Sequence, residues 1–240
     1  MQPLYSIIIP AYNEEQWVDR TLSTVKKAMK PLNDLGEIIV VDNSSTDNTA
    51  RIARQHNVQV VFEPINQISR ARNAGASVAQ GRFFIFLDAD TSLSLPLLQT
   101  ALHYLSSHKC CGGGCVVEMD TPMEHVARKA LDMWNWFSIT FGFAAGCFIY
   151  CLKEGFEAVG GFSEKVYASE EIWFSRRLQS WGKKRGMDFC IIEIPPIVTS
   201  SRKLQWFSPF RLVLPALLLM MFPFLLRFRL FCSPWYYRPK

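Results

Sequence analysis

The sequence lacks the cysteine pattern of a disulfide-bonded or zinc-binding domain. Its seven cysteines are an odd number, and none of them shows the paired spacing of a zinc knuckle. Free thiols in a reducing compartment are therefore expected. The first five residues also lack the positively charged segment of a secretory signal peptide, so no such leader is expected.

Acidic residues are missing from one end of the chain. Residues 201–240 contain no Asp or Glu but carry seven Lys and Arg side chains, whereas the whole 240-residue chain has a net charge of +5. The excess positive charge therefore belongs to this tail, and the rest of the chain is slightly acidic. Because the basic charge is confined to the tail, no nucleic-acid partner is expected.

Apolar residues are abundant, at 49% of the chain, which is enough for one large α/β domain with or without an appendage. Short apolar runs predict strands at 5–9, 37–41, 58–62 and 83–87, and helices are predicted over about 14–30, 47–55 and 69–80. Continuous apolar strands with intervening helices predict a mostly parallel sheet with helices on both faces.

Asp88-Ala89-Asp90 directly follows the apolar run 83–87. Mg²⁺ and Mn²⁺ prefer oxygen ligands and are commonly held by one or two carboxylates together with substrate phosphates. Two aspartates after a strand also serve as helix caps or turn formers, so the pair alone leaves both interpretations open. Ligands of parallel sheets bind at the carboxyl ends of the strands, where the Asn13, Asp42 and Asp88 regions are expected to meet, and this favours a metal site.

The second half of the chain contains a capping box and a long uncharged segment. Thr121-Pro122-Met123-Glu124 predicts a helix that begins there, because proline suits the first helical position. Residues 133–152 carry no charge and are long enough to cross a bilayer. Polar and glycine residues dilute this segment, so placement inside the domain is favoured and a membrane span is the alternative.

Residues 204–232 combine apolar, aromatic and basic side chains. The uncharged stretch 212–226 lies between Arg211 and Arg227 and contains Pro215 and Pro223. At ~1.5 Å per residue it covers roughly 22 Å, which is short of the ~30 Å hydrocarbon core. We therefore expect a segment that lies in or re-enters the cytoplasmic leaflet, where arginines attract anionic lipids. A buried core or dimer helix is the alternative.

Six segments occur in an order and spacing that resemble glycosyltransferase family 2, whose members have the GT-A nucleotide-sugar fold. They are Ser-Ile-Ile-Ile-Pro-Ala-Tyr-Asn-Glu at 6–14, Ile-Ile-Val-Val-Asp-Asn-Ser-Ser-Thr-Asp-Asn-Thr at 38–49, Ala-Arg-Asn-Ala-Gly at 71–75, Asp-Ala-Asp at 88–90, Gly-Gly-Phe-Ser-Glu at 160–164 and Ser-Glu-Glu at 169–171. The resemblance implies a Rossmann-like GT-A domain over 1–203. The residues that follow it, 204–240, are expected from their composition to form a membrane-associated helical tail.

The resemblance also implies roles for individual residues on the donor side. Asp90 would be the chief ligand of Mn²⁺ or Mg²⁺, and Asp88 would orient the nucleotide and sugar and complete the metal site. Asp42 would accept a hydrogen bond from the uracil imide, and Arg72 would contact a donor phosphate or sugar, since its guanidinium suits oxyanions. The remaining nucleotide-sugar contacts implied are Pro10, Ala11, Tyr12, Asn13, Glu14, Ser44 and Ala89.

An inverting displacement needs one general base, and the family places it in a Glu-Asp pair. This sequence has Glu170-Glu171 instead; Glu171 is favoured as the base, with Glu170 as support or alternate, and two carboxylates that complement a helix dipole are the structural alternative. Arg202 and Lys203 either contact the diphosphate or mark the start of the tail. No Gln-x-x-Arg-Trp motif is present, which argues against a processive polysaccharide synthase.

The expected activity is metal-dependent, inverting transfer of a sugar, a hexose above all, from a nucleotide sugar, with UDP favoured, to a hydroxyl acceptor. A sugar or a lipid-linked acceptor is expected, at the cytoplasmic face of a membrane. A polyprenyl-phosphate sugar transferase of the same fold and a catalytically silent nucleotide-binding membrane protein are the alternatives. The motifs do not specify the sugar.

Overall fold

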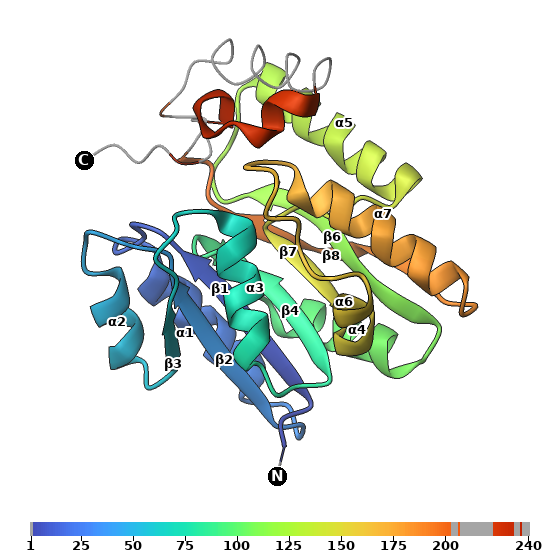
Figure 1. Cartoon of the computed structure of the whole chain (residues 1–240), viewed down its shortest axis with the longest axis horizontal. Helices are drawn as coiled ribbons and strands as arrows, with labels where there is room; N and C mark the ends of the chain where they lie inside the picture. Colours follow the sequence, from blue (N-terminus) through green and yellow to red (C-terminus); the bar gives the residue numbers. More distant parts are fainter. Residues whose placement is uncertain (1, 203–205, 207–222, 233–235, 237–240) are drawn as a thin grey trace.

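The computed structural model describes residues 2–202, 206, 223–232 and 236. Strands and helices alternate along most of this length, as Figure 1 shows. The strands are β1 (Tyr5–Ala11), β2 (Gly36–Asp42), β3 (Gln59–Phe62), β4 (Phe83–Leu87), β5 (Thr91–Ser92), β6 (Cys110–Met119), β7 (Phe148–Leu152) and β8 (Asp188–Thr199). The helices are α1 (Val18–Met29), α2 (Thr49–Gln55), α3 (Ile68–Val78), α4 (Leu95–Ser106), α5 (His125–Phe141), α6 (Lys153–Ala158) and α7 (Glu170–Lys183), followed by the short 3₁₀ helices η1 (Pro223–Arg227) and η2 (Arg229–Cys232).

Within the described residues, the strands form one sheet in the order β3-β2-β1-β4-β7-β6-β8-β5. The first four neighbours are parallel, with Ala11 opposite Asp42 and Ile8 opposite Phe86. The strand β7 runs antiparallel to both β4 and β6, and β5 runs antiparallel to β8. The sheet is therefore mixed, and its parallel half is the half that the apolar runs predicted.

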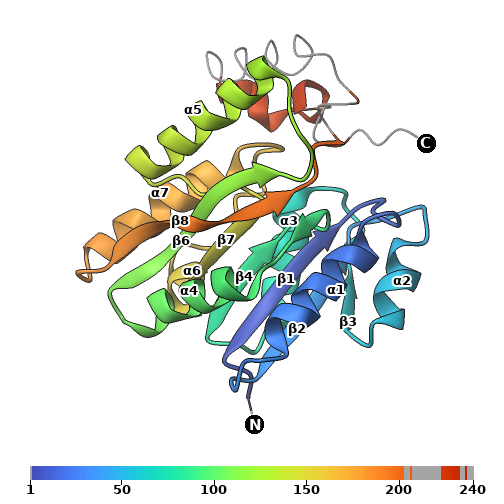
Figure 2. The same ribbon diagram turned by 180° about the vertical axis from the view of Figure 1, so that it is seen from behind.

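Helices cover both faces of the sheet, which confirms the layered α/β prediction. Alternate residues of the central strands point to opposite faces: Ile7 and Ile9 join a core beneath α1, α2, α4 and α5, whereas Ile8 joins a core beneath α3, α6 and α7. Figures 1 and 2 show these two layers from opposite sides. Both faces of β4 are buried, which explains its uninterrupted apolar sequence.

The helix predicted to begin at Thr121 begins instead at His125, with Glu124 before it in an extended conformation. The Thr121 hydroxyl pairs with Ser201 Oγ at 2.5 Å, so it does not cap the helix. The uncharged segment 133–152 is divided between the end of α5 and β7, and it is not one continuous helix. No helix in the described part of the chain has the length and apolar character needed to cross a membrane.

The predicted tail is described only in part. Residues 204–205 and 207–222 lie outside the description, as do Lys203, 233–235 and 237–240, so the expected segment 212–226 is seen only from Pro223 onward. The described tail residues pack on the loop before α7: Leu226 and Cys232 are buried against Ala168, and Tyr167 N–H donates to the Leu226 carbonyl at 2.7 Å. The boundary predicted at 203/204 and the membrane association stay predictions.

Candidate active site

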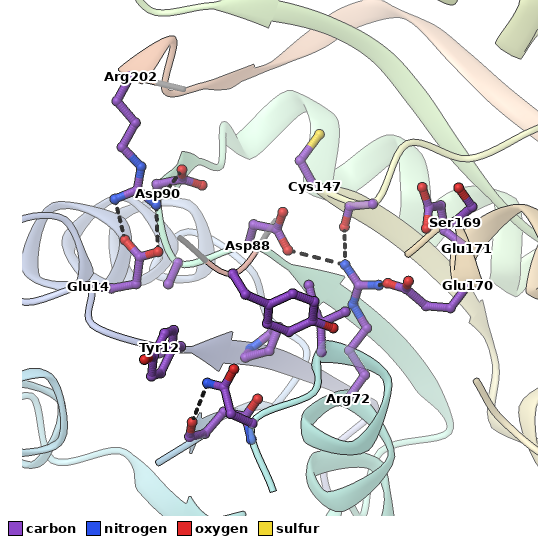
Figure 3. Close-up of a pocket in the computed structure, with 18 residues that line it drawn as sticks. Tyr12, Glu14, Arg72, Asp88, Asp90, Cys147, Ser169, Glu170, Glu171 and Arg202 are labelled. Carbon is purple, nitrogen blue, oxygen red and sulfur yellow. Dashed lines mark hydrogen bonds and ion pairs between the residues drawn. The ribbon is translucent and has the colours of Figure 1, made fainter. Parts of the chain in front are cut away.

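A pocket lies where the strand ends converge. The carboxyl ends of β1 and β4 and the loop before β7 border it, because β7 is antiparallel to β4 and Phe148 lies opposite Leu87. The amino-terminal end of α7 closes the far side (Figure 3). The pocket is lined by Pro10, Ala11, Tyr12, Glu14, Asn43, Asn66, Ile68, Arg72, Asp88, Ala89, Asp90, Gly146, Cys147, Ser169, Glu170, Glu171, Arg202 and Tyr236.

Backbone contacts hold the Asp88-Ala89-Asp90 turn. Asp88 N–H donates to the Cys147 carbonyl at 3.2 Å, and the Ala89 carbonyl accepts a hydrogen bond from Thr21 Oγ1 at 2.8 Å. The Asp90 carbonyl accepts one from Ser200 N–H at 3.2 Å. With its backbone fixed on three sides and Ala89 buried, the turn presents both carboxylates to the pocket.

Arg72 connects Asp88 to the start of α7. Its guanidinium is almost fully buried and donates from Nη1 to Glu170 Oε1 at 2.6 Å. Its Nη2 donates to Asp88 Oδ1 at 3.2 Å and to the Gly146 carbonyl at 2.8 Å, while the guanidinium lies over the Phe162 ring. Arg72 is therefore buried in the wall of the pocket and is not a solvent-exposed residue of α3.

Arg202 plays the corresponding part for Asp90. Its two terminal nitrogens donate to the two carboxylate oxygens of Glu14 at 2.5 Å, and Nη2 lies 2.9 Å from Asp90 Oδ2. Trp17 and Trp206 flank the guanidinium, with ring centroids 5.5 and 5.2 Å away. The planar fork of arginine suits this two-point contact. Arg202 therefore belongs to the pocket, whereas Lys203 lies outside the described residues.

The two adjacent glutamates have different surroundings. Ser169 adopts a left-handed backbone (φ 59°) immediately before α7, so both side chains enter the pocket from the first turn. Burial raises the pKa of Glu170, and the Arg72 guanidinium opposes that increase. The Glu171 carboxylate accepts no hydrogen bond from any described residue. Burial, followed by the nearby Glu170 carboxylate, raises the pKa of Glu171 to about 8.

The loops after β1 and β2 form one wall of the pocket. Asn13 has a left-handed backbone (φ 53°), and its Oδ1 accepts a hydrogen bond from Thr46 N–H at 2.8 Å. Asp42 Oδ1 accepts one from Ser45 N–H at 2.9 Å. Three predicted contacts, Asn13, Asp42 and Ser44, therefore lie in these loops next to lining residues but are not themselves among the residues that line the pocket.

Seven lining residues escaped the sequence prediction: Asn43, Asn66, Ile68, Gly146, Cys147, Ser169 and Tyr236. Asn43 lies inside the motif at 38–49 and Ser169 is the first residue of the motif at 169–171, but neither was assigned a contact of its own. Gly146 and Cys147 carry no local signal, because only the reversed direction of β7 brings them beside Asp88. Tyr236 reaches the pocket from the chain end, where its hydroxyl donates to the Tyr167 carbonyl at 2.9 Å.

A model of glycosyl transferase family 2 matches residues 6–160, which is more than half of the chain. The chain belongs to this family. The matched region holds Asp88, Asp90 and Arg72, whereas Glu171 and Arg202 follow it in the sequence.

Curated relatives of this family 2 glycosyltransferase are themselves glycosyltransferases. Glycosyltransferase AglE of Haloferax volcanii is 32% identical over 139 residues, which make up 55% of this chain and 45% of AglE. Poly(ribitol-phosphate) beta-N-acetylglucosaminyltransferase TarS of Staphylococcus aureus is 27% identical over 111 residues, 43% of this chain and 19% of TarS. The chain thus spans less than half the length of these relatives.

Solved structures of other glycosyltransferases have the same fold. The mannosyltransferase PcManGT of Pyrobaculum calidifontis, solved with GDP-Man and Mn²⁺, has a TM-score of 0.66 at 21% identity and covers 84% of this chain and 57% of its own. The crystal structure of residues 1–349 of S. aureus TarS has a TM-score of 0.63 at 18% identity, with coverages of 85% and 61%. These likenesses confirm the GT-A-like α/β architecture of the family 2 domain.

The carboxylate oxygens in the pocket of this family 2 glycosyltransferase are compatible with a divalent cation that a substrate phosphate also coordinates. Among the described residues, no group of three or more His, Cys, Asp or Glu side chains forms a complete metal site. Two aspartates one residue apart face the pocket, and Mg²⁺ and Mn²⁺ often take one or two carboxylates and fill their other positions with phosphate and water. The residues therefore fit the cation only in combination with a phosphate ligand.

Proposed function

We propose that this glycosyltransferase moves a sugar, a hexose above all, from a nucleotide sugar, with UDP as the favoured nucleotide, to a hydroxyl acceptor with inversion at the anomeric carbon. The carrying observation is the placement of Glu171, with its raised pKa, in the same pocket as Asp88 and Asp90. A base near a diphosphate-binding site is what an inverting displacement of this kind requires.

The charge of the pocket supports a metal-dependent donor site. Its described lining has five carboxylates, from Glu14, Asp88, Asp90, Glu170 and Glu171, against the guanidiniums of Arg72 and Arg202. A nucleotide diphosphate would meet net negative charge there unless a cation accompanied it. Mn²⁺ or Mg²⁺ held by Asp90 and Asp88 would neutralise the charge that develops on the leaving diphosphate.

The nucleotide would lie along the first two loops. Tyr12 and Asn43 line that side of the pocket, and Pro10 and Ala11 form its backbone edge. Asp42 is proposed to accept the uracil imide N–H through its second carboxylate oxygen, since its first accepts Ser45 N–H. TarS has been solved with UDP and with UDP-GlcNAc, and PcManGT with GDP-Man, so both nucleotides belong in the test.

Glu171 would take the proton of the acceptor hydroxyl. As that O–H bond breaks, the oxygen forms its bond to the anomeric carbon, and the bond from that carbon to the diphosphate oxygen breaks with its electron pair on the nucleoside diphosphate. Glu170 would position this base, because its own carboxylate is held by Arg72 at 2.6 Å. A phosphate acceptor is already ionised and needs no base, so the raised pKa of Glu171 favours a hydroxyl acceptor over polyprenyl phosphate.

A membrane location is also proposed, on the cytoplasmic face, where the acceptor would be a lipid or a lipid-linked sugar. Its support is the tail from 201 to 240, which is basic, apolar and without acidic residues. The part of the tail that the structure describes also contacts the loop before Glu170, which places tail residues beside the reaction centre.

The decisive experiment is a thermal-shift screen of the full chain with UDP, GDP, UDP-sugars and GDP-sugars, each with and without Mn²⁺. A ligand that binds the folded state raises the melting temperature with its concentration relative to its Kd. We expect a shift with a nucleotide diphosphate that grows when Mn²⁺ is present, followed by sugar release or transfer from the matching donor. A chain that binds no nucleotide diphosphate under either condition would overturn the proposal.

A further inference from the structure

The helix α5 is exposed to an unusual degree. It has 17 residues, of which only Leu131 and Ser138 are buried. Apolar side chains nevertheless recur along its outer side at intervals of three and four residues, which places them on one face of the helix. This outer face consists of Val126, Ala130, Met133, Phe137 and Phe141, with Trp136 beside it.

The outer face ends in a cluster of aromatic rings. The rings of Phe137 and Phe141 lie 4.4 Å apart, Trp136 contacts both of them, and Phe143 stacks beneath. Trp136 is 59% exposed and Met133 is 66% exposed, so the cluster is not part of the core. An exposed aromatic patch of this kind marks an interaction surface.

Lys129 borders this apolar face, because it lies one helical turn from both Val126 and Met133. Arg128 is on the other side of the helix, where it pairs with Asp132, the one acidic residue of the helix, at 3.1 Å. A helix with a Trp- and Phe-containing face and basic flanks is typical of segments that lie in a bilayer interface. The charge suits anionic lipid, and the absence of acidic residues from 201–240 extends that preference to the chain end.

The two 3₁₀ helices lie at the same end of the molecule as α5, as Figures 1 and 2 both show. They add a second apolar surface there. Phe228 and Leu230 are exposed there, and so is the basic Arg227. The segment is fastened to the pocket rim, because the Leu226 carbonyl accepts Tyr167 N–H and Arg229 donates to Asn66 Oδ1 at 2.9 Å.

The connections of α5 also lead to the pocket. Before the helix, Thr121 pairs with Ser201, the neighbour of the pocket residue Arg202. After the helix, the chain reaches the pocket residues Gly146 and Cys147 within a few positions. The exposed apolar surfaces therefore flank the pocket in the chain and share its end of the sheet.

We propose that the outer face of α5, together with η1 and η2, lies on an anionic membrane surface, and that the acceptor is a membrane lipid whose hydroxyl-bearing head group reaches Glu171 from that surface. The proposal rests on the proposed function for the chemistry, and it assigns α5 a role that the tail alone was expected to fill. In this arrangement the helix lies along the interface and does not cross the bilayer.

The test is co-sedimentation of the full chain with vesicles of phosphatidylcholine, with and without phosphatidylglycerol. The variant combines Trp136→Ser with Phe137→Ser, and the matched control is Leu35→Ser, which removes an exposed apolar side chain (50% exposed) before the amino end of β2. We expect tighter binding of the wild type to the anionic vesicles. Because two large apolar side chains are lost from the interface, the variant should bind on the order of tenfold or more weakly, and the control should bind like the wild type.

Hydrogen exchange of residues 125–141 and the nucleotide-induced thermal shift complete the experiment. Amides of α5 are partly protected by their helical hydrogen bonds, so the readout is the change on adding vesicles. A rise in protection with anionic vesicles supports the proposal. Protection that vesicles do not change, or that rises with protein concentration alone because a second copy covers the face, overturns the proposal, as does unchanged vesicle binding by the variant. If the wild type binds vesicles but no nucleotide, the proposed function is wrong, while the assignment of a membrane-binding surface is still supported.

Discussion

Replacing Glu171 and Glu170 one at a time distinguishes the proposed base from the residue that helps to raise its pKa. With a pKa of about 8, Glu171 is roughly one-tenth ionised at pH 7 and about nine-tenths ionised at pH 9. A carboxyl whose pKa is raised is protonated below that pKa, so the base is inactive at lower pH and becomes active as the pH increases. We therefore expect kcat/KM of the wild type to rise about tenfold between pH 7 and pH 9, because kcat/KM reports the ionisation of the free enzyme.

Glu171→Gln should lower kcat by roughly 10²- to 10⁴-fold, the usual contribution of a general base, and should remove the rising limb. Glu170→Gln removes the second cause of the raised pKa of Glu171. The rise in kcat/KM of this variant should therefore occur at lower pH than in the wild type, while the variant stays active. The assay is initial-rate transfer across this pH range at constant Mg²⁺, with the melting temperature of each variant as the control for folding. If kcat/KM of Glu170→Gln rises at the same pH as in the wild type, Glu170 does not raise the pKa of Glu171. Near-normal turnover of Glu171→Gln would show that Glu171 is not the base.

Three further predictions concern the arginines and the metal. Arg72→Met leaves Glu170 buried without its partner and should cost about 3–5 kcal/mol in urea unfolding, whereas Arg72→Met with Glu170→Gln should cost much less; equal costs would contradict the pairing. Arg202→Met removes the cation beside Asp90 and Glu14, so Mn²⁺ should bind several-fold more tightly without nucleotide, as measured by calorimetry; weaker binding would contradict the charge argument. Asp90→Asn should abolish the gain in UDP affinity that Mn²⁺ produces in the wild type, and a retained gain would exclude Asp90 as the ligand.

The parallel half of the sheet could be predicted from the sequence because its strands are buried on both faces. An uninterrupted apolar run such as Phe83–Leu87 records that burial directly, and parallel neighbours bring their carboxyl ends to one edge. Asp88 and Glu14 could therefore be assigned to one site from their positions after strands. Their arginine partners followed less directly, since the contact between Arg202 and Glu14 joins residues 188 positions apart.

The other half of the sheet, in which β6 pairs antiparallel with β7 and parallel with β8, carried weaker signals. The strand β6 contains three consecutive glycines where β-branched residues would normally mark a strand. Packing explains them: a Cβ on Gly113 would lie 1.8 Å from the Cys190 carbonyl oxygen, and one on Gly114 would lie 2.7 Å from the Ala144 Cβ. The glycines that let β6 approach its neighbours so closely have no side chains, so the apolar pattern that normally predicts a strand is missing there.

The two arginines show how the pocket can hold so many carboxylates before a substrate arrives. Arg72 contacts Asp88 and Glu170, and Arg202 contacts Asp90 and Glu14, so each aspartate of the turn has one guanidinium and each guanidinium has one glutamate. Burial of an unpaired charge is costly, and these pairings offset that cost in the free protein. Arg72 is anchored further by the Gly146 carbonyl, whereas Arg202 is held by Glu14 and by aromatic faces. A cation that bound Asp90 would compete with Arg202 for that carboxylate, while Arg202 could keep its two hydrogen bonds to Glu14 on the side where the diphosphate is proposed to bind.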